Sequence, residues 1–171
     1  DHQTLIEAAA ILVKTHPNAR FLLCGETIDN HNAALSGLIA KHNLASRFHL
    51  LGERDDIAEL TNAFDIATMS SSYGEGFPNV LAEAMACGVP WVSTAAGAAA
   101  QIWGGLGAVV QQSDSKAFAD ACLAILSLPP AERSALSKKV RQRIQDEFEI
   151  AAAVKRYQQV FRHFNKSAAL P

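Results

Sequence analysis

The chain has 171 residues, 49% of them hydrophobic and 19% charged, which is typical of one folded globular domain. A chain of this length buries enough surface to form a core without metals or disulfides, which excludes disorder and a miniature scaffold. The net charge of −2 gives no sign of a nucleic-acid partner or of attachment to anionic lipid. Residues 131–171 carry a charge of +5 against −7 for residues 1–130, which we interpret as solvated helix faces.

Cysteines, histidines and apolar runs exclude further classes of protein. Cys24, Cys87 and Cys122 are widely spaced within apolar runs. We therefore expect their side chains to be buried as small apolar groups, and the protein to lie in a reducing compartment. The six histidines form no pair at metal-ligand spacing, and we expect no metal and no cofactor. No apolar run has membrane-spanning length and the first residues lack a signal pattern, so we expect a cytoplasmic location, at most peripheral to a membrane.

The apolar periodicity predicts an alternation of helices and strands. Helical spacing covers residues 4–15, 32–43, 57–64 and 78–87, and short apolar runs cover residues 20–24, 48–51, 65–69, 91–94 and 107–111. From residue 114 the chain is all helix, at 114–127, 131–147 and 150–164. Because parallel strands need crossovers and bury both faces, this pattern predicts an α/β fold with a doubly wound, Rossmann-like parallel sheet and C-terminal helices.

Doubly wound sheets bind ligands beyond the carboxyl ends of their strands. The turns after residues 20–24 and 48–51 contain Gly25 and Gly52, and Gly97 follows residues 91–94. A missing Cβ there lets the backbone approach another group closely. Taken alone, these turns are best interpreted as ordinary strand-to-helix connections.

The loop after residues 65–69 contains more small and polar residues than the turns that follow the other predicted strands. Pro78 fits the first position of the helix that follows, and Gly88 fits a left-handed C-terminal cap. The start of such a helix offers unpaired N–H groups and a partial positive charge, which favour a phosphate. The candidate binding residues at this start are Gly76, Phe77, Asn79 and Val80.

Two glutamates, Glu75 in the loop and Glu83 in the helix, flank this start. At about 100° per residue, Asn79 and Glu83 share a face that differs from the apolar stripe, so we expect Glu83 to point away from the core. The stripe is formed by Val80, Leu81, Ala84 and Met85. The two carboxylates could bracket a phosphate while accepting hydrogen bonds from hydroxyls, as a sugar nucleotide requires. The residues alone equally allow a plain loop glutamate and a solvated helix glutamate.

Residues 75–90 read EGFPNVLAEAMACGVP and resemble the Glu-x7-Glu segment of the family 4 (group 1) retaining glycosyltransferases of GT-B fold. The flanks at residues 1–8, 21–26, 49–52 and 93–97 are also similar to that family, as is the closing helix with Tyr157 and Phe161. The resemblance implies that residues 1–171 are a single donor-binding domain. It would be a fragment of a two-domain enzyme of the hexosyltransferase class, without its first strand and its N-terminal acceptor domain.

The same resemblance implies roles for individual residues. Glu75, the candidate catalytic residue, would contact donor-sugar hydroxyls, and Glu83 the ribose hydroxyls. The amides around Gly76 and Phe77 would contact the sugar and the diphosphate, and the base would lie against Gly52, Glu53 and Arg54. The implied partners are a nucleoside-diphosphate sugar, the N-terminal domain of the same enzyme, and an acceptor that is a sugar, a lipid-linked sugar or a small molecule. The sugar, the base, the linkage and the oligomeric state stay open.

The chain departs from the family pattern at several positions. The family's usual Arg after the first strand and Lys before the position of Asp1 lie outside this sequence, which leaves the helix start and Arg54 as the sources of positive charge near a diphosphate. Ala95, Ala98 and Gln101 stand where the family often has Asp, Gly and Glu. We therefore expect no transfer by this chain alone. A GT-B epimerase acting on a sugar nucleotide, and a non-catalytic nucleotide-sugar-binding domain, remain as alternatives.

The resemblance also predicts a break in the sheet. In the strand order 3-2-1-4-5-6, the strand before Asp1 is the central one, so the strands at residues 21–24 and 66–69 should each lack a partner. Unpaired buried backbone groups cost about 1–3 kcal/mol each, so we expect marginal stability unless something fills the gap. An upstream segment and a strand from a neighbouring molecule are both candidates.

Overall fold

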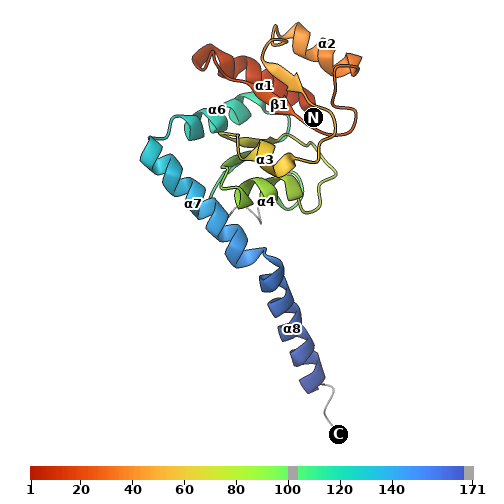
Figure 1. Cartoon of the computed structure of the whole chain (residues 1–171), viewed down its shortest axis with the longest axis vertical. Coiled ribbons are helices and arrows are strands. Elements are labelled where there is room, and N and C mark those ends of the chain that lie inside the picture. Colours follow the sequence, from red (N-terminus) through yellow and green to blue (C-terminus); the bar gives the residue numbers. More distant parts are fainter. Residues whose placement is uncertain (100–103, 168–171) are drawn as a thin grey trace.

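Helices and strands alternate from α1 to β5, after which the chain is helical (Figure 1). The computed structural model describes residues 1–99 and 104–167, with side chains as far as residue 164. Each strand lies within the run predicted for it, which confirms the expected alternation. The elements are α1 His2–Thr15, β1 Phe21–Leu23, α2 Ala33–Lys41, β2 Phe48–Leu50, α3 Ile57–Thr61, β3 Ala67–Met69, α4 Asn79–Ala86, β4 Trp91–Thr94, β5 Ala108–Val110, α6 Ser115–Leu126, α7 Pro130–Glu147 and α8 Ile150–Ser167.

The strands form two parallel sheets. β1 pairs with β2, and β4 pairs with β3 on one side and β5 on the other. β1 and β3 are not hydrogen-bonded to each other, although residues of both strands line one cavity of about 940 Å³. The predicted break between residues 21–24 and 66–69 is therefore confirmed.

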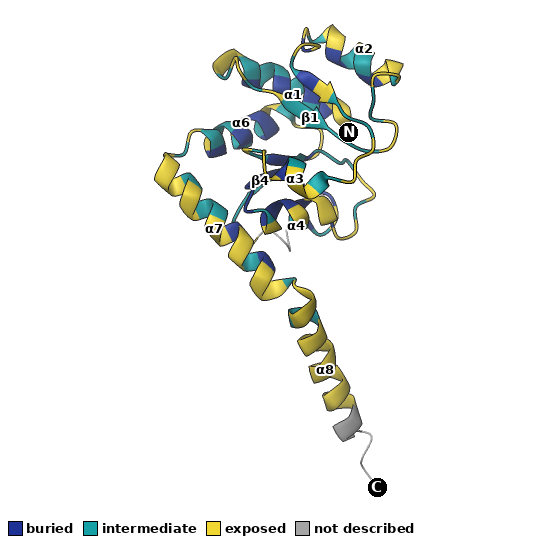
Figure 2. Cartoon of the chain, viewed as in Figure 1, coloured by how far each residue is buried: buried dark blue, intermediate teal, exposed yellow. Residues whose placement is uncertain are grey.

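Three clusters of buried side chains hold these elements together. One packs α4 and α7 against β3 and β4, around Trp91. A second joins α1, α6 and β4, and a third lies between α1, α2 and the β1–β2 sheet. The buried residues of Figure 2 lie along these inner faces. Because α1 contributes to the second and third clusters and packs along α6, it connects the two sheets from one face.

The ends of α4 differ slightly from the prediction. Pro78 does not occupy the first helical position: its φ of −75° and ψ of 89° are not helical, so it caps a helix that begins at Asn79. Gly88 follows the last turn with a φ of +76°, which confirms the predicted left-handed cap. Within the helix, Leu81, Ala84 and Met85 are buried as expected. Val80 is 51% exposed, which corrects the predicted apolar stripe at one position.

The two last helices, both of 18 residues, differ in packing. α7 buries Val140 and Ile144 against the body, whereas α8 runs away from it with its surface exposed (Figures 1 and 2). The large apolar side chains exposed on α8 are Ile150, Val154, Tyr157, Val160, Phe161 and Phe164. Within residues 1–99 and 104–167, no helix is long and apolar enough to cross a membrane.

The three cysteines are free thiols with different surroundings. Cys122 on α6 is 2% exposed, and burial raises the pKa of its thiol to about 12. Cys24 and Cys87 are only half-buried, so the predicted burial is wrong for these two. Cys24 follows β1, the strand that lacks a neighbour on one side, which explains its exposure.

Candidate functional site

Several turns meet at the carboxyl ends of the strands. The Gly25 N–H after β1 donates to the Gly52 carbonyl after β2 at 2.9 Å, and the Gly52 N–H donates to the Ile28 carbonyl at 2.7 Å. In the other sheet, the loop after β3 packs against the residues that follow β4. Within each sheet, the predicted loops therefore lie against one another.

Glu75 accepts a hydrogen bond from its own loop, and a hydroxyl group of β4 holds the backbone of that loop. The Ser71 hydroxyl donates to Glu75 Oε1 at 2.6 Å. The Thr94 hydroxyl, which is fully buried at the end of β4, donates to the Ser71 carbonyl. Glu75 Oε2 has no hydrogen bond within the described parts of the chain, so this half-buried carboxylate is oriented by one oxygen and can accept bonds at the other.

Gly97 brings the loop after β4 against the backbone of Glu75. Its φ is +58°, and a Cβ at this position would lie only 2.2 Å from the Glu75 carbonyl oxygen. The neighbouring Ala98 N–H donates to the Gly76 carbonyl at 3.0 Å. The sequence alone favoured an ordinary turn at Gly97, whereas the structure brings its backbone close to the candidate site loop.

The first turn of α4 has free N–H groups and room in front of them. The Leu81 N–H donates to the Pro78 carbonyl at 3.1 Å, so the earlier N–H groups of Asn79 and Val80 have no carbonyl behind them in the helix. Pro78 supplies no side-chain cap. A Cβ at Gly74 or Gly76 would meet no atom within 4 Å. This turn can accept an anion close to the backbone.

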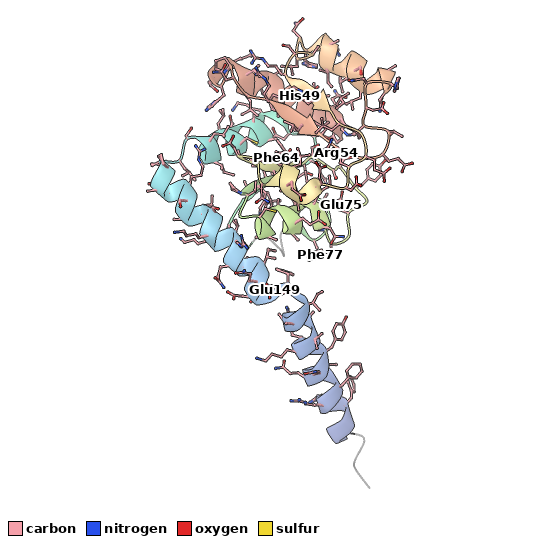
Figure 3. All side chains as sticks on the ribbon, viewed as in Figure 1. His49, Arg54, Phe64, Glu75, Phe77 and Glu149 are labelled. Carbon is pink, nitrogen blue, oxygen red and sulfur yellow. The ribbon has the colours of Figure 1, made fainter. Side chains whose placement is uncertain are left out.

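Glu83 and Asn79 are exposed on α4, opposite the buried residues of that helix, which confirms that Glu83 points away from the core. Figure 3 shows Glu75 and Phe77 on the same side of the molecule as Arg54. Glu75, Glu83 and the first turn of α4 therefore belong to one loop–helix unit. Carboxylates and free N–H groups in this unit can together bind a ligand that carries both hydroxyls and phosphate.

Phe77 connects this unit to the end of α7. Its ring is 46% exposed and lies 5.5 Å from the Phe148 ring, and the guanidinium carbon of Arg143 lies 5.8 Å from the centre of the Phe148 ring. The sequence assigned only the Phe77 amide a role. The aromatic contact fixes the loop before α4 relative to the end of α7.

The turn after β2 contains an ion pair that the sequence did not predict. Arg54 Nε donates to Asp56 Oδ1 at 2.6 Å, and Arg54 Nη2 bonds Asp56 Oδ2. This pairing raises the pKa of Arg54 and lowers the pKa of Asp56, and both groups are exposed. Arg54 is therefore already neutralised, which makes it a poorer source of charge for a diphosphate than expected. Gly52 is half-buried and Glu53 exposed beside it.

Sequence reasoning missed two residues that orient Glu75, namely Ser71 and Thr94. The run of three serines at residues 70–72 and the hydroxyl at the end of an otherwise apolar strand were the available signals. Of the positions that depart from the family pattern, Ala95 is exposed and Ala98 is half-buried, while Gln101 lies outside the described residues. Among the residues that the structure places, no group of three or more His, Cys, Asp or Glu could hold a metal ion, and the expectation of a metal-free site stays a prediction.

Comparison with known proteins places the chain among glycosyltransferases. A sequence profile described as "Glycosyl transferases group 1" matches residues 1–128. The chain is 27% identical over 161 residues to the N-acetyl-alpha-D-glucosaminyl L-malate synthase of Bacillus anthracis, covering 93% of this chain and 41% of that protein. Among solved structures, sucrose-phosphate synthase from Thermosynechococcus elongatus is similar with a TM-score of 0.80 and 28% identity, covering 98% of this chain and 44% of that one.

The Anabaena protein HepE, solved in complex with UDP, gives a TM-score of 0.79 and 25% identity, covering 95% of this chain and 44% of that one. The fold of these proteins thus extends over almost the whole chain. The chain spans about two fifths of the length of the relatives that it matches.

Proposed function

The chain belongs to the group 1 glycosyltransferases, and on that premise we propose that it is the donor-binding domain of a retaining enzyme of GT-B fold. Its length, about two fifths of the similar proteins, suits one of two domains. The observation that carries the proposal is the loop before α4, where Ser71 and the close approach of Gly97 hold Glu75 beside a helix start with free N–H groups. The donor is a nucleoside-diphosphate sugar.

In this proposal the first turn of α4 receives the diphosphate. The N–H groups of Asn79 and Val80, with those of Gly76 and Phe77 in the loop, donate to phosphate oxygens. The partial positive charge of the helix start also stabilises the nucleoside diphosphate as it leaves with the electrons of the broken bond to the sugar. The open space in front of Gly74 and Gly76 allows the donor to lie against the backbone.

In this proposal, the two glutamates bind different hydroxyl groups of the donor. Glu83, exposed on α4, accepts hydrogen bonds from the ribose, and Glu75 accepts from the transferred sugar through Oε2. The base lies against the turn of Gly52 and Glu53 after β2, where Arg54 is held by Asp56. Transfer further requires a domain that binds the acceptor, since positioning of both reactants supplies much of the rate.

Binding of UDP, the nucleotide in the HepE complex, tests the donor site. We expect UDP to shift the amide resonances of Gly76, Phe77 and Asn79 in the chain. A hydrogen bond to a charged group contributes roughly 1.5–3 kcal/mol, so Glu83→Ala should weaken UDP binding about tenfold to a hundredfold. Glu132→Ala, which removes an exposed glutamate from the first turn of α7, is the matched control. Unchanged affinity in Glu83→Ala would assign Glu83 to the solvated surface.

Glu75 is tested by turnover in an enzyme that carries both domains. Glu75→Gln keeps the size of the side chain and the contact with Ser71, but removes the negative charge beside the transferred sugar. We expect a fall in kcat with little change in the affinity for the nucleoside diphosphate. The opposite result, weak nucleotide binding with normal turnover at saturation, would reverse the roles of the two glutamates.

A further inference from the structure

Phe77 lies where the loop before α4 meets the end of α7. Its ring centre lies 5.5 Å from the centre of the Phe148 ring, and the two ring planes are tilted by 51°. Figure 3 shows Phe77 between Glu75 and Glu149 in this view, and Glu149 is the residue that follows Phe148 in the chain. The aromatic pair is therefore an attachment of the candidate site loop that is separate from its contacts with the residues after β4.

The backbone of this loop has few neighbours to hold it. Gly74 and Gly76 flank Glu75, and a Cβ at either glycine would meet no atom within 4 Å. Glycine also has more backbone freedom than any other residue. The Ala98 N–H donates to the Gly76 carbonyl at 3.0 Å. Because the carbonyl and the N–H of one trans peptide point in opposite directions, this bond turns the Phe77 N–H away from Ala98.

Phe148, by contrast, is well anchored. Its N–H donates to the Ile144 carbonyl at 2.9 Å, which attaches it to the last turn of α7. Its side chain packs against the buried cluster around Trp91. The guanidinium carbon of Arg143 lies 5.8 Å from the centre of its ring. The Phe77 ring therefore lies against a side chain that the core holds in place.

Phe148 is also held where α7 passes into α8. The Glu149 carbonyl accepts a hydrogen bond from the Ala153 N–H at 3.0 Å in the first turn of α8. Arg156 on α8 donates through Nη2 to the Glu147 carbonyl at the end of α7. These bonds connect the residues on both sides of Phe148. They limit how far the ring of Phe148 can move relative to the loop before α4.

We propose that Phe148 is a positioning residue of the donor site and acts through Phe77. The Phe77 ring is held by Phe148 and the Gly76 carbonyl by Ala98, so the peptide between Gly76 and Phe77 has little freedom to turn. Its N–H stays directed at the bound phosphate. Without the Phe148 ring, binding must first order this peptide, which weakens the affinity for the nucleoside diphosphate. This inference rests on the proposed donor site and adds to it a residue that does not touch the ligand.

Titration calorimetry of the 171-residue chain with UDP measures this role. From the usual strength of an aromatic pair, we expect Phe148→Ala to weaken UDP binding about threefold to tenfold. Phe148→Tyr keeps the ring, so its affinity should stay within about twofold of that of the unmodified chain. Phe161→Ala, which removes a phenyl ring that is 65% exposed on α8, is the matched control and should bind UDP as the unmodified chain does.

Hydrogen exchange without ligand separates positioning from general stability. The Ala98 amide reports on the loop, and the Ala95 amide, which donates to the Val110 carbonyl at 2.8 Å, is the reference. We expect Phe148→Ala to speed exchange at Ala98 at least about fivefold and to leave Ala95 unchanged. Equal acceleration at both amides would assign Phe148 to general stability and overturn the proposal. If Phe148→Ala does not fold, Phe148→Leu, which keeps an apolar side chain without the ring, takes its place.

The double variant shows whether Phe148 acts through Phe77. Phe77→Ala should weaken UDP binding as much as Phe148→Ala, and the two changes together should weaken it no further. Additive losses, or an unchanged affinity in Phe148→Ala, overturn the proposal while leaving the donor site intact. Absence of UDP binding to the unmodified chain would instead overturn the proposed donor site, and this role of Phe148 with it.

Discussion

β4 and β1 are both apolar parallel strands, but they differ in how far their residues are buried. Trp91, Val92, Ser93 and Thr94 of β4 are all completely buried, and β4 is paired on both sides. All three residues of β1 are only half-buried, although its sequence, FLL, is more apolar than WVST. β1 has one neighbouring strand, and its residues line the cavity of about 940 Å³ that β3 also lines. The comparison shows that the number of neighbours, rather than the hydrophobicity of the strand, sets its burial here.

The largest expected effect comes from emptying the core around β4. Trp91→Ala should lower the free energy of unfolding by about 3–5 kcal/mol, since a fully buried aromatic side chain is lost. Phe21→Ala should cost only about half as much, because Phe21 is only half-buried, with its ring stacked on the Phe48 ring at 4.8 Å. Urea denaturation of both variants measures the difference.

Trp91→Phe is the control for this comparison. Trp91 Nε1 is buried without a hydrogen-bond partner in the described part of the structure, so a phenyl ring loses no such bond. We expect a clearly smaller loss than for Trp91→Ala. Equal losses for Trp91→Ala and Phe21→Ala would mean that the two sheets are equally well packed in solution.

The second effect concerns the contact between the loop after β4 and Glu75. Gly97→Ala places a Cβ 2.2 Å from the Glu75 carbonyl in a backbone conformation that disfavours side chains, so we expect a loss of about 2–4 kcal/mol in the free energy of unfolding. Gly74→Ala is the matched control, because Gly74 has a φ of +83° but open space around it. It should cost only about 1–2 kcal/mol. A similar cost for both variants would show that the loops are not in contact.

The smallest effect is a pH dependence at the junction of the two sheets. Cys122 belongs to the cluster that joins α1, α6 and β4, and its native pKa of about 12 lies above the ordinary value near 9. Above pH 9 the unfolded chain releases the thiol proton and the native chain keeps it, so this contribution to stability is complete below pH 9 and is lost as pH rises toward 12. By pH 10 the loss is about 1.4 kcal/mol.

Denaturation of the chain and of Cys122→Ala at pH 7 and pH 10 measures this contribution. The variant should lose less stability than the unmodified chain over this interval. An identical change in both proteins would mean that water reaches Cys122, and therefore that the junction of the two sheets is open.

The order and type of the elements could be predicted because they depend on local patterns. Continuous apolar runs ending at turn residues marked all five described strands, and Gly88 marked the end of α4. The resemblance to a known family added the strand order, and with it the break between β1 and β3. It also directed attention to Glu75 and Glu83, whose roles remain proposals.

Contacts between distant residues could not be predicted in this way. The bond from Thr94 to Ser71, the approach of Gly97 to Glu75 and the tilted ring contact of Phe77 with Phe148 each join segments separated in the chain. The pairing of Arg54 with Asp56 is local, but it depends on side-chain conformations that periodicity does not describe.

The sequence by itself determined the succession of helices, strands and turns, because backbone preferences and apolar periodicity act over a few residues. Only the tertiary structure decided which of the apolar residues became core. Val80 and Cys24 lie in apolar runs typical of a core, but they line the cavity shared by β1 and β3 and stay partly exposed. The physical reason is that burial requires atoms on every side of a side chain, and those atoms come from elements far away in the chain.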